Sequence, residues 1–261
     1  MKPRARIASA AALLVAAIPA GRAADAALED LVSRLDRVRI PARSCAATIE
    51  ISRPDRPGEP TQVFRSFTRV DGSGAGRRTS ALLVCAAPAK DAGKVLLFTP
   101  DACWFYDPKA KNPARLSPGQ LWSQPASADS PNWHLATDFS AAPAGREEIV
   151  CGDGARRACA VIDFAPRLAS LAAPALMRYW VGDDGRYWRA EHYTAGRRLA
   201  KTIEGVTYGG GAGATHVAGM TIRSGPEAAG VRVIRMVAKE SPAAWFEPGA
   251  LSSIGQEVGV E

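Results

Sequence analysis

The chain has 261 residues, of which 47% are apolar and 23% charged, and its 33 basic against 26 acidic residues give a formal net charge of +7. These proportions are those of a globular protein and exclude a mainly disordered or fibrous one. The 24 glycines and 19 prolines follow no repeating period, which excludes a collagen-like chain and is typical of a β-rich protein with many turns.

Residues 1–23 have the pattern of a secretory signal peptide. Three basic residues within the first six precede an apolar run, Ile7–Ala20, and small residues follow. We expect cleavage after Ala23 or Ala26; the alternative, an uncleaved membrane anchor, is disfavoured because the apolar run is short. No cysteine lies near the cleavage site to accept a lipid. We therefore expect an exported, soluble periplasmic protein in which residues 24–261 form a single domain.

One amphipathic helix is predicted from Asp25 to Arg39, ending before Pro41. Its apolar residues recur at steps of three and four: Leu28, Leu31, Val32, Leu35 and Val38. This stripe needs an apolar surface to cover.

After Pro41 the apolar period changes to two, which predicts strands. They cover residues 44–52, 61–70, 77–86, 94–99 and 102–106, and then 146–151, 157–164, 176–182, 186–194, 198–207, 215–223 and 230–238. The segment between the two groups is broken by prolines and has room for short helices near 118–123 and 131–139. The short turns cannot hold crossover helices, so successive strands should pair antiparallel in one large curved sheet or barrel.

The cysteines agree with an oxidising compartment, in which disulfides can form. Cys151 and Cys159 flank the segment GDGARRA, and a hairpin there would bring the two thiols together in a disulfide. Cys45, Cys85 and Cys103 leave either one further bridge, for which Cys85 with Cys103 is the first choice, or three free thiols. No spacing of Cys or His is that of a metal site, so we predict neither metal nor cofactor.

No arrangement of catalytic residues is found. The three histidines stand apart and outside any motif: His134, His192 and His216. Gly209, Gly211 and Ala214 match G-x-G-x-x-A, but they lie between two antiparallel strands and not before a crossover helix. Removing residues 1–23 takes away four basic residues and no acid, so the charge falls from +7 to +3. We therefore expect neither an enzyme nor a nucleic-acid-binding protein.

Two blocks of aromatic and basic residues form the most distinctive pattern. The first block contains Lys94–Phe98 (KVLLF), Cys103–Pro108 (CWFYDP) and Arg115–Pro118 (RLSP). The second contains Tyr179-Trp180-Val181, Trp188, Tyr193, Gly196-Arg197 and Lys201-Thr202, and Trp245-Phe246 follows near the C-terminus. Over nearly the whole mature chain this pattern resembles the LolA-like outer-membrane lipoprotein-sorting proteins.

The resemblance implies a mainly β, unclosed antiparallel half-barrel of about eleven strands, with short lid helices over an apolar cavity. Members of that family carry the acyl chains of lipoproteins across the periplasm, from an inner-membrane transporter to an outer-membrane receptor. We therefore expect a soluble carrier, monomeric, whose ligand is the acyl chains of lipoproteins or of another lipid. The alternative is an envelope sensor or regulatory module that binds a partner protein on the same fold.

Apolar and aromatic strand residues are the candidates for the wall of such a cavity, because a carrier must remove acyl methylenes from water at about 0.8 kcal/mol each. We expect the chain to contact Leu83, Leu96, Phe98, Trp104, Tyr106, Met177, Tyr179, Trp188 and Tyr193. Leu31, Val32 and Leu35 of the predicted helix would cap the cavity. The resemblance also implies an arginine on an early strand that holds the lid, for which Arg65 and Arg69 are both candidates.

Overall fold

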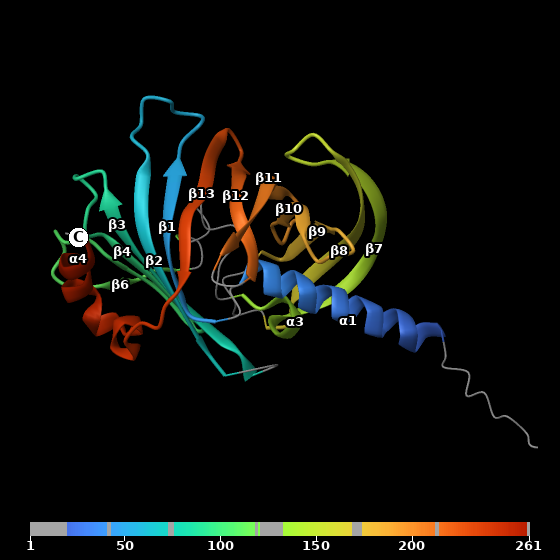
Figure 1. Cartoon of the computed structure of the whole chain (residues 1–261), viewed down its shortest axis with the longest axis horizontal. Coiled ribbons are helices and arrows are strands. Elements are labelled where there is room, and N and C mark those ends of the chain that lie inside the picture. The colour runs from blue at the N-terminus through green and yellow to red at the C-terminus, as the bar shows by residue number, and fades with distance from the viewer. Residues whose placement is uncertain are drawn as a thin grey trace, which may run out of the picture.

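The computed structural model describes residues 20–40, 43–72, 76–117, 120, 133–168, 174–211 and 214–259. These residues form one 13-stranded antiparallel sheet with a long N-terminal helix and a few short ones (Figure 1). The helices are α1 (Ala20–Arg39), α3 (Leu135–Asp138), η3 (Ala243–Phe246), η4 (Pro248–Ala250) and α4 (Leu251–Gly259). The strands are β1 (Cys45–Ser52), β2 (Gln62–Asp71), β3 (Arg78–Ala87), β4 (Val95–Thr99), β5 (Ala102–Tyr106), β6 (Ala114–Arg115), β7 (Phe139–Val150), β8 (Arg156–Pro166), β9 (Leu176–Val181), β10 (Tyr187–Tyr193), β11 (Leu199–Gly211), β12 (Ala214–Ser224) and β13 (Glu227–Ala238).

The sheet consists of two meanders joined along one pair of strands. Its order is β6-β5-β4-β3-β2-β1-β13-β12-β11-β10-β9-β8-β7, so the chain runs outward from β1 to the edge strand β6 and then crosses to the other edge, β7. From β7 it returns through consecutive hairpins to β13, which pairs antiparallel with β1. The edges β6 and β7 do not pair, which confirms the mainly β, unclosed fold, with 13 strands in place of about eleven.

The register of the strands divides their side chains between two faces. We call the face that α1 covers the inner face and the opposite one the outer face. Two apolar clusters lie on the inner face, one beneath α1 with Phe164 and Tyr179 and one on β3–β5 with Ala81 and Phe98. On the outer face, cross-strand partners form ion pairs, including Asp163 with Arg178 at 2.7 Å and Glu50 with Arg232 at 2.6 Å.

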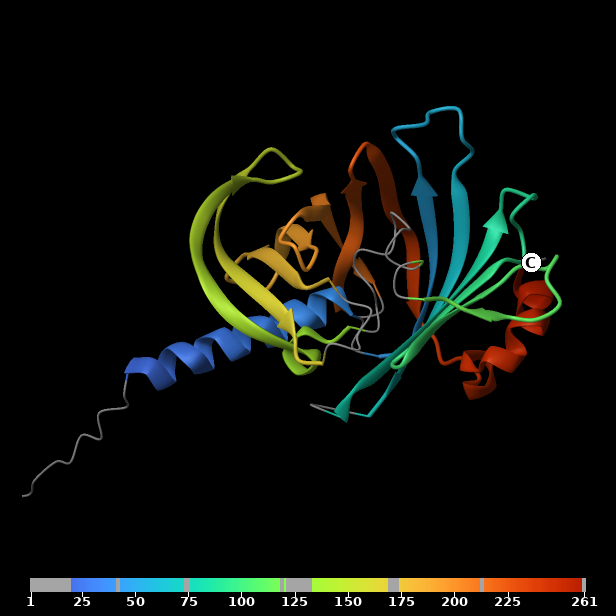
Figure 2. The ribbon, with the colours of Figure 1, turned by 180° about the vertical axis from the view of Figure 1, so that it is seen from behind.

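Helix α1 crosses the concave side of the curved sheet (Figure 2). Its apolar stripe places Val32 and Leu35 in the cluster on β7–β12, and the helix also contacts α3. The turn between β9 and β10 approaches the helix so closely that a Cβ on Gly185 would lie 2.5 Å from the Cβ of Arg34. Gly185 also has φ +84°, so both its conformation and its surroundings require glycine.

Helix α4 packs on the outer face of β2–β5, which was not predicted. Phe246, Leu251, Ile254 and Val258 contact Phe67, Leu82, Val84, Val95 and Leu97 in one cluster. A Cβ on Gly255 would lie 2.5 Å from the carbonyl oxygen of Gly93, so glycine allows the helix to approach the turn between β3 and β4. Consequently this part of the outer face is apolar and covered.

The segment between the two strand groups differs from the prediction. Strand β7 begins at Phe139 and not near 146, because an edge strand tolerates Pro143, which donates no ladder hydrogen bond. The two-residue strand β6 was also not predicted. Of the two expected helices, the later one is α3, whereas the one near 118–123 lies outside the described residues apart from Gln120.

The N-terminal segment is described only from Ala20, where α1 begins, so most of the expected signal peptide lies outside the described residues. None of the helices in the described part of the chain is long and apolar enough to cross a membrane.

The expected disulfide between Cys151 and Cys159 is wrong: all five cysteines are free and buried thiols, so Cys85 and Cys103 are not bridged either. The hairpin turn is centred on Asp153, and the register therefore places Cys159 opposite Glu147, four residues before Cys151. Four residues of strand span about 13 Å, whereas a disulfide requires Cα atoms within about 7 Å. Burial raises the pKa of the Cys103 thiol to about 12 and that of Cys159 to about 11.

Candidate functional site

The inner face is apolar along most of the sheet but is not covered evenly. Beneath α1 its side chains on β8–β10 are fully buried, as for Met177 and Tyr179, which expose 0% of their surface. On β1, β3–β5 and β13 some of its apolar side chains are only half-buried, and we call these residues the open strip. They are Ala47, Ile49, Ile51, Leu83, Leu96, Phe105, Val233 and Met236. Among the described helices, α1 packs on β7 and β12 and α4 on the outer face, which leaves this strip uncovered by either.

Five of the nine residues expected to contact an acyl chain lie on the inner face. Leu83 and Leu96 are cross-strand partners within the open strip, and Phe98 lies beside them in the same cluster. Met177 and Tyr179 are deeper, in the cluster beneath α1. The structure therefore places these five residues on one surface, although in two differently covered parts of it.

The other four residues lie on the outer face. Trp104 and Tyr106 pack beneath α4. Trp188 belongs to a separate cluster with Trp180, where the guanidinium of Arg157 lies 4.0 Å from the centre of its ring. Tyr193 donates a hydrogen bond from its hydroxyl to Glu191. They fall outside the surface that the remaining candidates share.

The expected lid residues divide in the same way. Leu31, Val32 and Leu35 lie on the face of α1 that packs against the inner cluster. Arg65, however, donates a hydrogen bond from Nη1 to the carbonyl oxygen of Val258 at 2.7 Å, which ties β2 to α4 on the outer face. Arg69 pairs with Asp71 at 2.9 Å. Neither of these two interactions involves α1.

A buried group of polar residues holds α1 against α3, and sequence reasoning missed it. We call Asp36, Arg39, Thr79 and His134 the polar junction. The carboxylate of Asp36 accepts hydrogen bonds from the backbone N–H groups of Leu135 and Ala136, both at 2.9 Å, and pairs with Arg39 at 3.2 Å. It thus satisfies the free N–H groups at the start of α3, as a capping residue does, but from another helix. Its position four residues after Val32, on the buried stripe of α1, was the available signal.

His134 connects the same junction to the sheet. Its Nε2 lies 3.0 Å from the hydroxyl oxygen of Thr79 on β3, and its backbone N–H donates to the carboxylate of Asp138 at 2.9 Å. Burial lowers the pKa of His134, and the nearby cations Arg77 and Arg39 lower it further, whereas Asp36 and Asp138 oppose the shift. The neutral ring is therefore favoured in the folded protein.

Two ionisable side chains are buried on the inner face between β10 and β11. His192 on β10 and Lys201 on β11 are register partners, and they expose 0% and 1% of their surfaces. The ring centre of His192 lies 6.2 Å from that of Tyr179 and 6.5 Å from that of Trp133. Burial lowers the pKa of Lys201 to about 8. The alternation of β10, which places His192 on the same face as Ala190, indicated this position.

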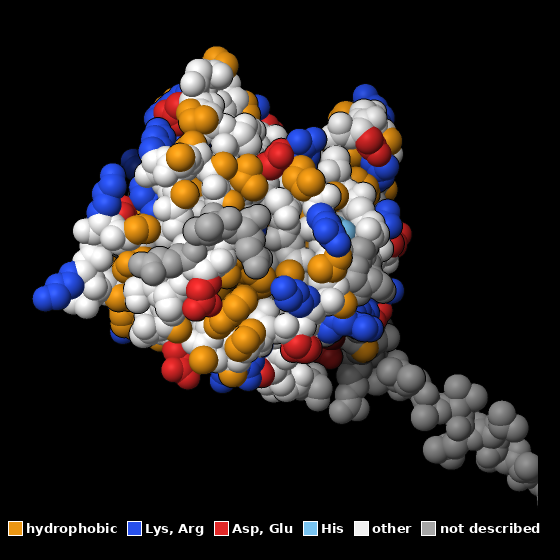
Figure 3. All heavy atoms as spheres, turned by 60° about the vertical axis from the view of Figure 1, so that its left-hand side comes forward, with side chains coloured by type: hydrophobic (Ala, Val, Ile, Leu, Met, Phe, Trp, Pro, Cys, Tyr) orange, Lys and Arg blue, Asp and Glu red, His pale blue; other side chains and the backbone are white. Residues whose placement is uncertain are grey.

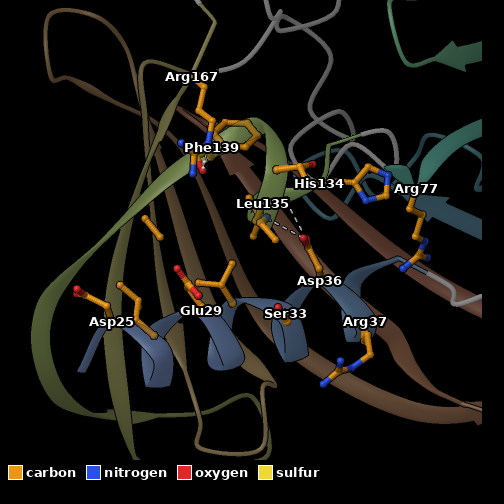
Figure 4. A pocket seen from close by; sticks show the side chains of 15 residues that line it. Asp25, Glu29, Ser33, Asp36, Arg37, Arg77, His134, Leu135, Phe139 and Arg167 are labelled. Carbon is orange, nitrogen blue, oxygen red and sulfur yellow. Dashed lines mark hydrogen bonds between the residues drawn. The ribbon is translucent and has the colours of Figure 1, made fainter. Parts of the chain in front are cut away.

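A cleft of about 730 Å³ lies between α1, α3 and β7 and reaches the start of β3 (Figure 4). We call it the α1–α3 cleft. Its apolar walls are Leu28, Val32, Leu135, Ala136, Phe139 and Ala141, and its polar lining is Asp25, Glu29, Ser33, Asp36, Arg37, Arg77, His134, Thr137 and Arg167. Its volume is within the range of small-molecule sites. Within the described ranges, no three His, Cys, Asp or Glu side chains are placed to hold a metal ion.

Comparison with known proteins gives a clear likeness in structure only. No family model and no curated protein matches the sequence. A DUF1329 family protein from Desulfovibrio piger superposes with a TM-score of 0.71 at 21% identity, over 87% of this chain and 98% of that one. A LolA superfamily protein from Nitrosomonas europaea gives 0.65 at 18% identity, over 84% of this chain and 97% of that one.

A domain from Vibrio parahaemolyticus, described as an outer-membrane lipoprotein-sorting protein, gives a TM-score of 0.69 at 14% identity, over 85% of this chain and 97% of that one. All three likenesses extend over most of the sheet. The resemblance drawn from the aromatic and basic blocks is thus confirmed at the level of the fold. The chain has the open antiparallel fold that the LolA-superfamily, lipoprotein-sorting and DUF1329 structures share.

Proposed function

We propose that this protein is a carrier that holds the acyl chains of a lipoprotein or another lipid against the inner face of its half-barrel. The observation that carries the proposal is the difference between the two faces. The open strip is apolar and only half-buried, whereas the outer face is covered by α4 or bears ion pairs between adjacent strands. On the side of the molecule that carries α4, apolar side chains lie between charged ones (Figure 3).

The energetics of an acyl chain favour such a surface. Each methylene removed from water contributes about 0.8 kcal/mol, so contact with a few half-buried leucine and isoleucine side chains provides useful affinity. A wall open on one side also permits release, which a sealed pocket would prevent. Leu83, Leu96 and Phe98 contact the chain in this proposal, and Met177 and Tyr179 form the deeper end beneath α1. The likeness to lipoprotein-sorting structures supports the same function.

The proposal includes the route of the carrier. Residues 1–23 direct export and are removed, and the mature protein is a periplasmic monomer without catalytic activity. It receives its cargo from an inner-membrane transporter and delivers it to an outer-membrane receptor. The pattern of charged, apolar and small residues before α1 supports the export step.

A charge on the open strip tests the carrier function. Leu96→Glu places a carboxylate where the acyl chain would lie, and we expect at least about tenfold less lipid to be retained, because burial of an unpaired charge is costly. The amount of bound lipid is measured by native mass spectrometry with lipid extraction, on protein purified from its own host.

Leu199→Glu is the matched control, because Leu199 exposes 53% of its surface at the start of β11. It introduces the same charge and should retain lipid as the unmodified protein does. Equal lipid in all three proteins, each shown to be folded by circular dichroism, would contradict the inner face as the binding surface. A protein that carries no lipid and takes up none would contradict the carrier function itself.

A further inference from the structure

The two edges of the described sheet differ in length. Strand β6 at one edge has two residues, whereas β7 at the other has 12, and no described strand pairs with β7 on the side away from β8. Alternate residues of such a strand direct their backbone N–H and C=O groups away from the sheet, where another extended chain can bond to them. Natural proteins protect a long edge with proline, charge or a β-bulge. The position of such protection on β7 therefore decides where a second chain can pair with it.

The second half of β7 has this protection and the first half does not. Pro143 donates no backbone hydrogen bond, the register shifts between Pro143 and Gly145, and three charged residues follow at 146–148. In Ser140–Ala142, by contrast, the side chains are small and uncharged, and the first and last of them are exposed. An extended chain can therefore pair with β7 at Ser140–Ala142.

The unprotected part of β7 borders the α1–α3 cleft, and α1 lies on the other side of the cleft (Figure 4). The buried side chains of Phe139 and Val32 form the floor, so an occupant would contact the half-buried Leu28 and the backbone of Ser140–Ala142. The carbonyl oxygen of Phe139 already accepts a hydrogen bond from Nε of Arg167 at 3.0 Å, so the free edge begins at Ser140. Several peptide-binding domains add an extended peptide to an edge strand of this kind.

The charges that line the cleft suit a peptide with a cationic side chain. Asp25 and Glu29 lie one turn apart on α1, are exposed, and form no ion pair within the described part of the chain. Asp36, at the other end of the helix, is already bonded to the N–H groups of α3 and to Arg39. A lysine or arginine of the occupant would therefore be attracted to Asp25 and Glu29.

The cleft is continuous with the surface proposed for the acyl chain. Val32, Leu135 and Phe139 line the cleft and belong to the same cluster as Met177 and Tyr179. A molecule whose acyl chain lies on the inner face could therefore extend its polar part along β7.

We propose that the free edge of β7 at Ser140–Ala142 binds an extended segment of polypeptide as an additional strand, with a lysine or arginine of that segment at Asp25 and Glu29. The inference rests on the proposed function, because the continuity of the two surfaces identifies this polypeptide as the one that bears the acyl chains. Hydrogen bonds between backbones provide affinity that does not depend on sequence. The carrier would thus recognise the peptide of its cargo as well as the lipid.

The experiment measures whether a peptide attached to an acyl chain adds affinity through its backbone. Isothermal titration calorimetry compares N-dodecanoylglycinamide with the N-dodecanoyl form of Thr-Lys-Thr-Lys-Thr-Lys, below their micellar concentrations. We expect the peptide to strengthen binding at least about tenfold, since it adds several hydrogen bonds and a charge contact. Methylation of alternate backbone nitrogens removes donors and keeps the side chains. For one of the two alternating sets it should return the affinity to that of N-dodecanoylglycinamide.

Two proline variants test the same pairing from the side of the protein. Neighbouring residues of a strand direct their N–H groups in opposite directions. One of S140P and A141P therefore removes a donor from the free edge, and the other removes one from the ladder between β7 and β8. We expect one of the two to keep the unmodified circular dichroism spectrum and yet bind the peptide ligand no better than N-dodecanoylglycinamide.

The charge contact is tested with D25N/E29Q. This variant should bind the lysine peptide several-fold more weakly and leave the affinity of its glutamine analogue, Thr-Gln-Thr-Gln-Thr-Gln, unchanged. D30N is the matched control, because Asp30 lies on the same helix but pairs with Arg34.

The results separate this inference from the carrier function. Equal affinity of N-dodecanoylglycinamide and the peptide ligand, or a gain that survives both methylation patterns, would overturn the inference and leave the carrier function intact. Failure of the unmodified protein to bind any of the dodecanoyl ligands would overturn both proposals.

Discussion

At the scale of single residues, the carboxylate of Asp36 joins α1 to α3. It accepts hydrogen bonds from two backbone N–H groups of another helix and pairs with Arg39, whose side chain is only 1% exposed. A buried carboxylate is tolerated where such partners replace water. The position of α3, and with it one wall of the α1–α3 cleft, therefore depends on this side chain.

Asp36→Ala should destabilise the fold by about 3 kcal/mol, because it removes the acceptor of two N–H groups and the carboxylate that pairs with the buried Arg39 guanidinium. The midpoint of urea unfolding measures the change. Asp30→Ala is the control, since Asp30 forms an exposed ion pair with Arg34 on the same helix and should change stability by less than about 0.5 kcal/mol. Similar values for the two variants would show that Asp36 does not hold the junction.

His134 should make stability depend on pH. Its folded-state pKa lies below the value of an unfolded histidine, so the unfolded chain takes up more protons in the interval between the two. The free energy of unfolding should therefore have its full value above about pH 6.5 and should fall as the pH decreases through that interval. His134→Gln should show a smaller loss between pH 7.5 and pH 5 in urea titrations. An unchanged slope would contradict this account of the ring.

At the scale of elements, the position of α4 limits what can be predicted from the apolar pattern of the strands. Because α4 covers an apolar outer face and a second apolar cluster lies on the inner face, both faces of β3–β5 are apolar. Alternation shows which residues share a face, but it does not show which face lies inside the curve. For this reason Leu96 and Trp104 seemed equivalent in the sequence, although they lie on opposite faces. The spacing of Leu251, Ile254 and Val258 was the signal for α4.

Gly255→Ala tests how closely α4 must approach the sheet. Alanine normally favours a helix over glycine by about 1 kcal/mol, but the new Cβ would lie 2.5 Å from the carbonyl oxygen of Gly93. We expect a net loss of about 1–3 kcal/mol in the free energy of unfolding, because the helix must shift. Gly249→Ala, where a Cβ would meet nothing within 4 Å, should be neutral. A gain in stability at Gly255 would place α4 farther from β3 and β4.

At the scale of the whole molecule, local patterns predicted most of the architecture. Twelve of the 13 strands were expected, eleven of them close to their positions, because two-residue alternation and short turns are properties of the local sequence. The two residues of β6 are too few to show a period. The polar junction and the α1–α3 cleft could not be derived, since they bring α1 together with β3 and α3, which are remote in the chain.

The pairing of β1 with β13 also determines how the chain must fold. Every other pair of adjacent strands in the described sheet is consecutive in sequence, so each meander can form from local hairpins. The loop that brings Cys45 opposite Ala238 contains most of the chain. The entropic cost of closing this loop must therefore be overcome by the pairing of β1 with β13 alone. A chain emerging N-terminus first therefore keeps one edge of β1 unpaired until β13 has emerged, and that edge is exposed to other chains throughout this interval.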